Sequence, residues 1–528
     1  MHLQWLVTVG LLLATQGHGA KILGLFPFPA RSHLIVQKAL MKELARRGHE
    51  VTVMSSHPES KPIPNYTDIP LQANFETISK GHAPKNLFDM QTMGPIQLTM
   101  MMWYLAESIC DTVLQEKDVQ QLIHSSNLHF DLVVIEAFYN ECFLGFAHKF
   151  NAPVVQVCPY GGSNFMADWV GSPNPYSYVP DEFLDYSDKM NFWERFHNSF
   201  IASVKHVTRQ LIHMPKQDAV VKKYFNYTGA GEFPSIWDLE TKTSLVLLNS
   251  HHSLNFPKPL MPNYVQVGGM HVQPTKKLPQ DLQQYLDNAP DGVIYFSMGS
   301  NLQSSQMPES KRNAILKAFS KLKQKVLWKW ETETLPGQPP NVKLGKWLPQ
   351  NDILAHPNVR LFITHGGLLS TQEAVTRGMP LVGIPVFADQ SLNMGRAVAS
   401  GYALMIDFQN ITTESLTWAI KEILEKPKYR ENAQRLSRIY RDQPLSPLEQ
   451  AVYWTEYVIR HKGAPHLRSA ALDLAWYQYF LLDVIAVLAL GTGTVLFVVF
   501  LILRTVLRKV CGGKKRESVS VPGKKKRN

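Results

Sequence analysis

The chain has 528 residues, of which 45% are hydrophobic and 18% are charged, as in globular proteins with a membrane segment. This length exceeds what one hydrophobic core serves, so we expect two domains. The net charge of +11 does not indicate nucleic-acid binding, because ten Lys or Arg and one Glu lie from Arg504 onward and leave the rest nearly neutral.

Residues 1–20 have the pattern of a secretory signal peptide. An apolar run, Trp5–Ala14, is followed by small residues that end at Gly19 and Ala20. We therefore expect cleavage near Gly19 or Ala20 and a lumenal body that begins near Lys21.

The body opens with a strand, a helix and a second strand, which indicates a parallel α/β domain over residues 21–250. Lys21–Phe28 and His49–Met54 are the predicted strands, and Ser32–Arg47 is the helix between them. Ser32 is the expected N-cap, and Gly48 ends the helix.

His33 lies in the first turn of this helix, just beyond the end of the first strand, where parallel sheets place their reactive residues. The positive helix end disfavours imidazolium, so a neutral ring could act as a general base. A surface histidine without a role is the alternative. A base of this kind needs an acidic partner, and Glu136, at the end of the apolar run Phe130–Ile135, is the best candidate. Asp131 lies at the opposite end of that strand and is expected to be structural.

A methionine-rich stretch, Met90–Cys110, suits either apolar acceptors or core packing. No two cysteines form a Cys-x-x-Cys pair, so neither a zinc site nor a redox site is expected. For Cys110, Cys142 and Cys158 we prefer buried free thiols, with one disulfide as the open alternative. Cys511 is expected to be an unmodified thiol, with palmitoylation as its alternative.

A proline-rich stretch, residues 251–285, is the predicted linker to a second domain over 286–441. That domain begins with a strand, Gly292–Gly299, which is followed by Ser300. A helix from Pro308 and a strand, Lys325–Trp330, come next. Helices continue to about Arg441.

The most informative stretch of the second domain runs from Trp347 to Gln390. A strand, Val359–Thr364, runs into His365-Gly366-Gly367 and then into a helix that begins near Leu368. Glycines allow close backbone approach, and a helix N-terminus favours an anion. This pattern predicts a phosphate-bearing ligand held by Thr364, His365, Gly366, Gly367, Ser370 and Thr371. Trp347 offers a flat face on which a base can stack, and Gln350 offers an amide. Glu373 supplies a carboxylate for ribose hydroxyls. Asp389 and Gln390 supply polar groups for the hydroxyls of a sugar.

The ordered set W-x-x-Q, H-G-G, E, P-x-x-x-x-P and D-Q resembles the signature of the UDP-glycosyltransferase family, the membrane-bound animal UDP-glucuronosyl- and UDP-glucosyltransferases. The resemblance extends from Lys21 to the basic tail. It implies two facing Rossmann-like domains of the GT-B type, an N-terminal one for the acceptor and a C-terminal one for the UDP-sugar. The implied reaction is inverting transfer of a hexosyl group from a UDP-sugar to a small lipophilic acceptor. Since no Asp-x-Asp motif occurs, neither a metal ion nor another cofactor is expected.

Residue roles follow from the resemblance by position. Trp347 would stack on uracil, and Gln350 and Glu373 would hold the ribose. Ser300, His365, Gly367 and Ser370 would face the diphosphate, and Asp389 and Gln390 the sugar. His33, in the F-P-x-x-S-H stretch, would be the general base.

Three positions depart from the family pattern. Leu369 replaces an Asn of many mammalian members. Glu136 replaces an Asp and adds one methylene, about 1.5 Å of reach. Lys258 stands where glucuronate-using members often carry Arg, whose bidentate fork suits a carboxylate. The last departure favours UDP-glucose over the alternative donor, UDP-glucuronate. The first two motivate a rival interpretation, a non-catalytic lumenal binder of apolar small molecules.

The C-terminal part predicts a membrane anchor. Residues 442–483 hold an expected return helix, Pro444–Arg460, and a juxtamembrane segment. Val484–Leu503 has 20 residues without a charge, enough to span a bilayer. The basic tail, residues 504–528, indicates a cytosolic end and a type I orientation. Lys525-Lys526 resembles a dilysine retrieval signal, so we expect the endoplasmic reticulum membrane. The resemblance to membrane-bound family members implies that the chain can self-associate as a homo-oligomer. Three lumenal sequons begin at Asn65, Asn226 and Asn410.

Overall fold

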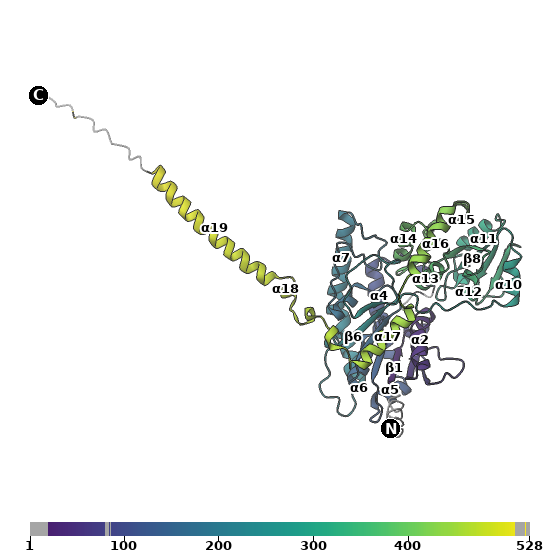
Figure 1. Ribbon diagram of the computed structural model, residues 1–528, viewed down its shortest axis with the longest axis horizontal. Coiled ribbons are helices and arrows are strands. Elements are labelled where there is room, and N and C mark those ends of the chain that lie inside the picture. The colour runs from purple at the N-terminus through teal and green to yellow at the C-terminus, as the bar shows by residue number, and fades with distance from the viewer. Residues whose placement is uncertain (1–18, 80–83, 85, 513–522, 524–528) are drawn as a thin grey trace, which may run out of the picture. The chain divides into compact units, whose positions relative to one another are not determined.

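The computed structural model describes residues 19–79, 84, 86–512 and 523. The predicted signal peptide, apart from its last two residues, and the terminal lysine pair lie outside this described part. The chain divides into two compact units, Met1–Ser469 and Ala470–Asn528. The first unit holds two sheets with their helices (Figure 1).

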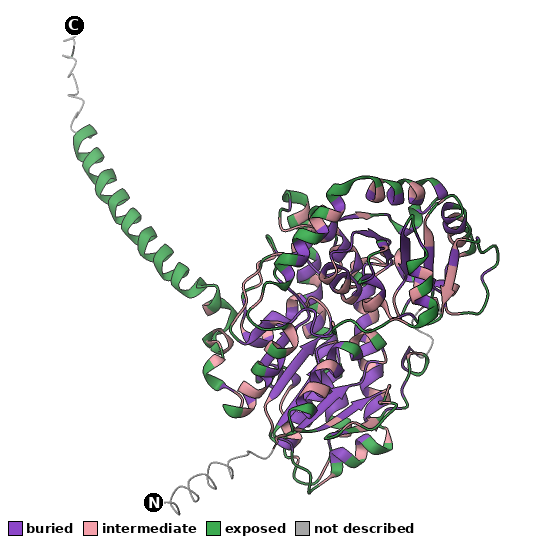
Figure 2. Cartoon of the chain, turned by 45° about the vertical axis from the view of Figure 1, so that its right-hand side comes forward, coloured by how far each residue is buried: buried purple, intermediate pink, exposed green. Residues whose placement is uncertain are grey.

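The first sheet has seven parallel strands in the order β3-β2-β1-β4-β5-β6-β7. Its central strands are runs of Val, Ile and Leu that are buried along nearly their whole length (Figure 2), as expected where helices cover both faces. The strands are β1 (Lys21–Phe26), β2 (Glu50–Ser55), β3 (Tyr66–Pro70), β4 (Leu132–Glu136), β5 (Val154–Cys158), β6 (Thr243–Leu248) and β7 (Tyr264–Gln266).

The helices of this part differ in length and kind. Longer ones cover the sheet, and short 3-10 or π turns connect them. They are α2 (Arg31–Arg46), α3 (Phe75–Ser79), η1 (Leu87–Thr92), α4 (Pro95–Leu114), α5 (Lys117–His124), η2 (Glu141–Phe143), α6 (Leu144–Phe150), η3 (Asn164–Val170), α7 (Phe192–Thr208), η4 (Arg209–His213), α8 (Met214–Tyr224) and α9 (Ile236–Glu240).

The second sheet has six parallel strands in the order β10-β9-β8-β11-β12-β13. β8 and β11 lie side by side at its centre, so the segments that follow them share one edge. The strands are β8 (Val293–Ser297), β9 (Lys325–Lys329), β10 (Val342–Gly345), β11 (Val359–Thr364), β12 (Leu381–Gly383) and β13 (Ala403–Met405). The helices are α10 (Gln280–Asp287), η5 (Ser304–Gln306), α11 (Glu309–Phe319), α12 (Gln350–Leu354), α13 (Leu368–Thr376), α14 (Gln390–Ala399), η6 (Phe408–Asn410), α15 (Thr413–Glu425) and α16 (Pro427–Arg441).

Several segments connect the two sheets. The stretch predicted as a linker contributes β7 to the first sheet and α10 to the second; β7 was not predicted because a three-residue edge strand leaves no periodic signal. After α16 the chain returns as α17 (Pro447–Arg460), which packs against α2 and β6 (Figure 1). In the opposite direction, η1 places Phe88 in the core of the second sheet, stacked on Phe408 with ring centroids 5.1 Å apart.

Two local expectations differ from the structure. The first helix begins at Arg31 with Ala30 as its N-cap, so Ser32 is helical and caps nothing. The expectation of free thiols was wrong for two cysteines, because Cys110 of α4 and Cys142 of η2 form a disulfide across 32 residues. Cys158 is a buried free thiol. The pairing was not readable because it depends on α4 packing beside η2, a tertiary contact.

The second unit contains η8 (Ala470–Asp473), α18 (Trp476–Tyr479) and α19 (Leu482–Cys511); η7 (Pro465–Leu467) precedes it in the first unit. α19 has 30 residues, a mean hydropathy of 2.7 in its most apolar window and no buried residue (Figure 2). At 1.5 Å per residue it is about 45 Å long, enough to cross a bilayer. Among the described residues it alone meets this length and composition.

Candidate active site

His33 and Glu136 lie within hydrogen-bonding distance at the carboxyl end of the first sheet. His33 comes from the first turn of α2 and Glu136 from the last position of β4, and Nδ1 of the ring lies 2.8 Å from Oε1 of the carboxylate. Glu136 is fully buried, and its Oε2 accepts the backbone N–H of Phe28 at 3.3 Å. With Nδ1–H donating to the carboxylate, Nε2 carries the free lone pair that a general base uses.

Aromatic rings fix the orientation of His33. Phe28 stacks on the imidazole with ring centroids 5.1 Å apart, and Phe138 meets it edge-on at 4.5 Å. The histidine side chain is 16% exposed, so one edge stays accessible. This apolar surround suits a lipophilic molecule whose hydroxyl reaches Nε2.

The second sheet contributes a glycine-lined turn at the end of β11. His365 lies between two glycines: a Cβ on Gly299 would come within 2.5 Å of its ring, and one on Gly367 within 2.4 Å. Gly299 also has φ +85°, a conformation that other residues rarely adopt. Gly366 has φ +82°, and a Cβ there would lie 2.5 Å from Met394. Thr364, at the end of β11, is buried, and its hydroxyl accepts the N–H of Gly366 at 3.4 Å.

The electrostatics of this turn keep His365 neutral. Burial and the positive charge of Lys329 lower the pKa of His365 to about 4. A neutral imidazole can donate one N–H to a phosphate oxygen without bringing a charge of its own. α13, a helix of nine residues, begins directly after this turn with Gly367 as its N-cap, and the free backbone N–H groups of its first turn favour an anion.

Three predicted donor residues form one hydrogen-bonded cluster. The Gln350 amide donates to Ser370 Oγ at 3.0 Å and to Glu373 Oε2 at 2.7 Å, and its oxygen accepts the Tyr295 hydroxyl at 3.3 Å. Burial raises the pKa of Glu373 to about 7, although the hydrogen bond from Gln350 and the charge of Arg377 act to lower it. A polar cluster of this kind can exchange its internal bonds for those of a ribose.

Trp347 lies at the border between the two sheets. Its side chain is 60% exposed, and the Arg31 guanidinium lies 5.8 Å above the indole ring. Arg31 begins α2, two residues before His33, so this cation–π contact brings the predicted base-stacking residue to the first sheet. The Asn301 amide also donates to Ser32 Oγ, at 3.3 Å. Ser300 precedes Asn301 after β8 and is partly exposed.

Asp389 and Gln390 lie at the start of α14 and differ in their hydrogen-bond partners. The Asp389 carboxylate accepts the Asn393 amide at 3.0 Å, and burial raises its pKa while the charge of His33 lowers it. Asp389 therefore interacts electrostatically with the catalytic candidate of the other sheet. The Gln390 side-chain oxygen accepts the backbone N–H groups of Val386 and Phe387, so it holds the preceding loop and leaves only its amide nitrogen for a ligand.

Leu369 has an apolar role in this structure. It projects from α13 of the second sheet and packs against the hydrophobic cluster beneath the first sheet, which includes Met270 and Val452. An amide at this position would lie against apolar groups, so the departure from Asn exchanges a polar group for packing between the two sheets.

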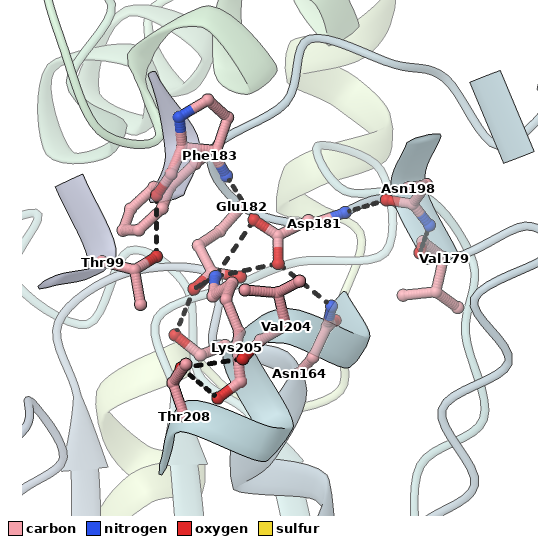
Figure 3. Close-up of polar contacts among 12 residues, drawn as sticks. Thr99, Asn164, Val179, Asp181, Glu182, Phe183, Asn198, Val204, Lys205 and Thr208 are labelled. Carbon is pink, nitrogen blue, oxygen red and sulfur yellow. Dashed lines mark hydrogen bonds and ion pairs between the residues drawn. The ribbon is translucent and has the colours of Figure 1, made fainter. Parts of the chain in front are cut away.

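Sequence reasoning missed a buried charged cluster of the first domain (Figure 3). The Lys205 ammonium lies 2.8 Å from Asp181 Oδ2 and 2.6 Å from Glu182 Oε1, and all three side chains are nearly inaccessible. The Asn198 side chain accepts the Asp181 N–H at 2.8 Å. Burial raises the pKa of Asp181 to about 6. The negative charge of Glu182 adds a small contribution that raises the pKa of Asp389. The only signal in the sequence is the pair Asp181-Glu182 in a proline-bordered loop.

The three sequon asparagines lie on the surface. Asn65, Asn226 and Asn410 are all exposed, which a glycosylated residue requires.

Comparison with known proteins identifies the family. The family described as "UDP-glucoronosyl and UDP-glucosyl transferase" matches residues 21–517. The chain belongs to the UDP-glycosyltransferase family. The resemblance read from the residue pattern is thereby confirmed.

Similar UDP-glycosyltransferases occur in insects and mammals. UDP-glycosyltransferase UGT5 of Dactylopius coccus is 39% identical over 496 residues, with 93% of each chain covered. UDP-glucosyltransferase 2 of the same insect is 35% identical and covers 96% of this chain and 97% of its own. UDP-glucuronosyltransferase 2C1 of Oryctolagus cuniculus is 34% identical, and the match covers 88% of this chain and 94% of the rabbit protein. Glucosyl and glucuronosyl transferases are therefore both among the relatives.

Solved structures share the fold of this UDP-glycosyltransferase. The calicheamicin glycosyltransferase CalG4 aligns with a TM-score of 0.52 at 20% identity, over 84% of this chain and 99% of its own. UDP-glucose: anthocyanidin 3-O-glucosyltransferase in complex with UDP aligns with a TM-score of 0.53 at 18% identity and the same coverage. These structures show the two-sheet GT-B fold, and membership of the UDP-glycosyltransferase family makes the chain a hexosyltransferase rather than a non-catalytic binder.

Proposed function

We propose that this enzyme transfers glucose from UDP-glucose to a hydroxyl group of small lipophilic acceptors, with inversion at the anomeric carbon, as a detoxification-type conjugation. The observation that carries the proposal is the His33–Glu136 pair, whose Nδ1 and Oε1 atoms lie 2.8 Å apart at the carboxyl end of the first sheet. A base and a sugar-binding carboxylate from opposite sheets then flank one reacting centre.

The reaction follows from this arrangement. His33 Nε2 takes the proton of the acceptor hydroxyl, and Glu136 stabilises the imidazolium that forms. The acceptor oxygen attacks the anomeric carbon from the face opposite UDP. The bond between that carbon and the UDP oxygen breaks, and the electron pair leaves with UDP. The neutral His365 and the N-terminus of α13 stabilise the negative charge on the departing diphosphate. In this proposal the enzyme uses no metal ion or cofactor, because these groups supply the charge stabilisation.

Donor residues are proposed from their places in the structure. Trp347 stacks on uracil, the Gln350–Ser370–Glu373 cluster opens to hold the ribose, and Asp389 binds sugar hydroxyls. Gly366, Gly367, Thr364 and Ser300 line the diphosphate. Gln390 contributes its amide nitrogen, since its oxygen holds the loop.

Lys258 is the residue on which the choice of donor depends. Its ammonium lies 5.7 Å above the ring of Tyr264 and forms no ion pair with any carboxylate in the described residues. Lys258 lacks the fork that binds a carboxylate in two places, which supports glucose. The same unpaired cation could meet the carboxylate of UDP-glucuronate, so that donor is the second candidate.

The donor experiment compares kcat/KM for UDP-glucose and UDP-glucuronate in microsomes from cells that express the chain, with a mixed panel of phenols as acceptors. We expect faster release of UDP from UDP-glucose, with little change in Lys258→Met. A preference for UDP-glucuronate that falls by about 10- to 100-fold in Lys258→Met, the loss of one charge-assisted contact, would establish the second donor instead.

We further propose that the enzyme resides in the endoplasmic reticulum membrane as a type I protein. Its body would be lumenal, with α19 spanning the bilayer and the basic tail cytosolic. The exposed sequons and the apolar α19 support this arrangement. Glycosidase-sensitive glycans on Asn65, Asn226 or Asn410 would test it.

A further inference from the structure

A cleft of about 460 Å³ lies in the second domain, and none of its lining residues belongs to the proposed donor or acceptor site. This volume is within the range of small-molecule sites. The lining comes from the segment after β7, the residue that follows α12, the end of α13 and one face of α16. Its polar residues include Thr275, Thr376, Arg377, Ser437, Arg438 and Arg441.

The three arginines of this cleft lack carboxylate partners. Within the described residues, neither Arg377, Arg438 nor Arg441 forms an ion pair. Asp352 and Glu373 both attract Arg377 through space without forming an ion pair with it, and the Asp352 carboxylate accepts the backbone N–H of Lys276 at 2.9 Å. Three like charges around one cleft repel one another, and a bound anion would relieve that repulsion.

Arg377 is held in place for such a contact. Its Nη2 donates to the carbonyl of Gln273 at 3.2 Å and to the Asn351 side-chain oxygen at 2.8 Å, while no described residue accepts from Nη1. Arg438 and Arg441 are exposed on α16, where an entering molecule reaches them. The planar guanidinium suits the paired oxygens of phosphate or sulfate.

The location connects the cleft to the two sheets. Thr275 belongs to the segment that links β7 to α10, and Arg441 ends α16, just before the chain returns to α17. A ligand that contacts Thr275, Arg377 and Arg441 would link the β7–α10 segment and the end of α16 to the end of α13.

We propose that this arginine cleft binds a small soluble molecule through a phosphate or sulfate group, at a site separate from that of the UDP-sugar. The inference does not depend on which sugar or acceptor the enzyme uses, because binding is measured without turnover.

The test is thermal unfolding of the full-length enzyme in detergent, with saturating UDP to fill the donor site. Inorganic phosphate and inorganic sulfate are titrated separately against chloride at equal ionic strength. We expect a saturable rise in Tm of about 1–2 °C at tenfold excess over Kd with one or both ions. The rise should disappear in the double variant Arg438→Gln/Arg441→Gln and persist in Arg435→Gln, an exposed arginine of the same helix outside the cleft.

The ion that gives the larger shift identifies the ester class. A rise equal to that in chloride, a rise that persists in the double variant, or no rise with either ion would overturn the proposal. If the double variant does not fold, equilibrium dialysis of labelled phosphate against wild type and the single variant Arg438→Gln decides, with unchanged uptake counting against the site.

Discussion

Replacing Glu136 by Gln removes one negative charge and keeps the shape of the side chain. Glu136 is fully buried and contacts His33 Nδ1 at 2.8 Å, so the hydrogen bond is charge-assisted and shielded from water. Such a bond contributes about 2 kcal/mol, and the amide can also present its NH2 to Nδ1, which puts the proton on the wrong ring nitrogen. At about 1.4 kcal/mol per factor of ten, kcat should fall about 30-fold or more.

The assay separates catalysis from binding. Initial rates of UDP release at saturating acceptor should show a lower kcat for Glu136→Gln with the KM of the UDP-sugar unchanged. Glu136→Asp keeps the charge but shortens the side chain by about 1.5 Å. Its kcat should therefore lie between those of the wild type and Glu136→Gln. A Glu136→Gln variant with wild-type kcat would refute the reasoning, because His33 would then not depend on this carboxylate.

Three further predictions concern the donor site and stability. Since the pKa of Glu373 is raised to about 7, its side chain becomes a charged carboxylate as the pH rises through 7. UDP affinity, measured by calorimetry, should increase over the same pH range, because the carboxylate oxygens accept hydrogen bonds from the ribose hydroxyls. Gly299→Ala should weaken UDP binding by about tenfold or more, because its Cβ displaces the imidazole beside it. Joint replacement of Cys110 and Cys142 by Ser should lower the free energy of unfolding by about 3–4 kcal/mol in denaturant titrations, since the bridge closes a loop of 32 residues.

Matched controls accompany these predictions. The pH dependence should be absent in Glu373→Gln; its persistence would assign it to another group. Gly337→Ala imposes the same left-handed strain at φ +76° with only Leu316 nearby, at 3.8 Å, so it should leave UDP affinity intact; equal losses in the two variants would point to general strain. Cys511→Ser should leave stability unchanged, and an effect as large as that of the double replacement would contradict the disulfide argument.

The parts of the fold that the sequence predicts are those with local signals. β1, α2 and β2 follow from hydrophobic periodicity and a stop at Gly48, and β11 with its glycine turn follows from an apolar run and His365. The approach of His33 to Glu136 was also foreseeable, because His33 follows β1 and Glu136 ends the neighbouring parallel strand β4. The ends of such strands meet at one edge of the sheet.

Other features depend on contacts between distant segments. The pair Cys110–Cys142 requires α4 to pack on η2, and Lys205 meets its two carboxylates only after α7 closes on the loop. Phe88 inserts into the other domain from a stretch without periodicity. None of these leaves a pattern in neighbouring residues, so no local rule finds them.

The most direct test of the account compares wild type with His33→Ala in microsomes supplied with UDP-glucose and a phenol panel, with glucoside formation and UDP binding both measured. We expect turnover to fall by at least about 100-fold while UDP binds as in the wild type. Glucoside formation at the wild-type rate in His33→Ala would contradict the account, because the proton would then leave the acceptor by another route.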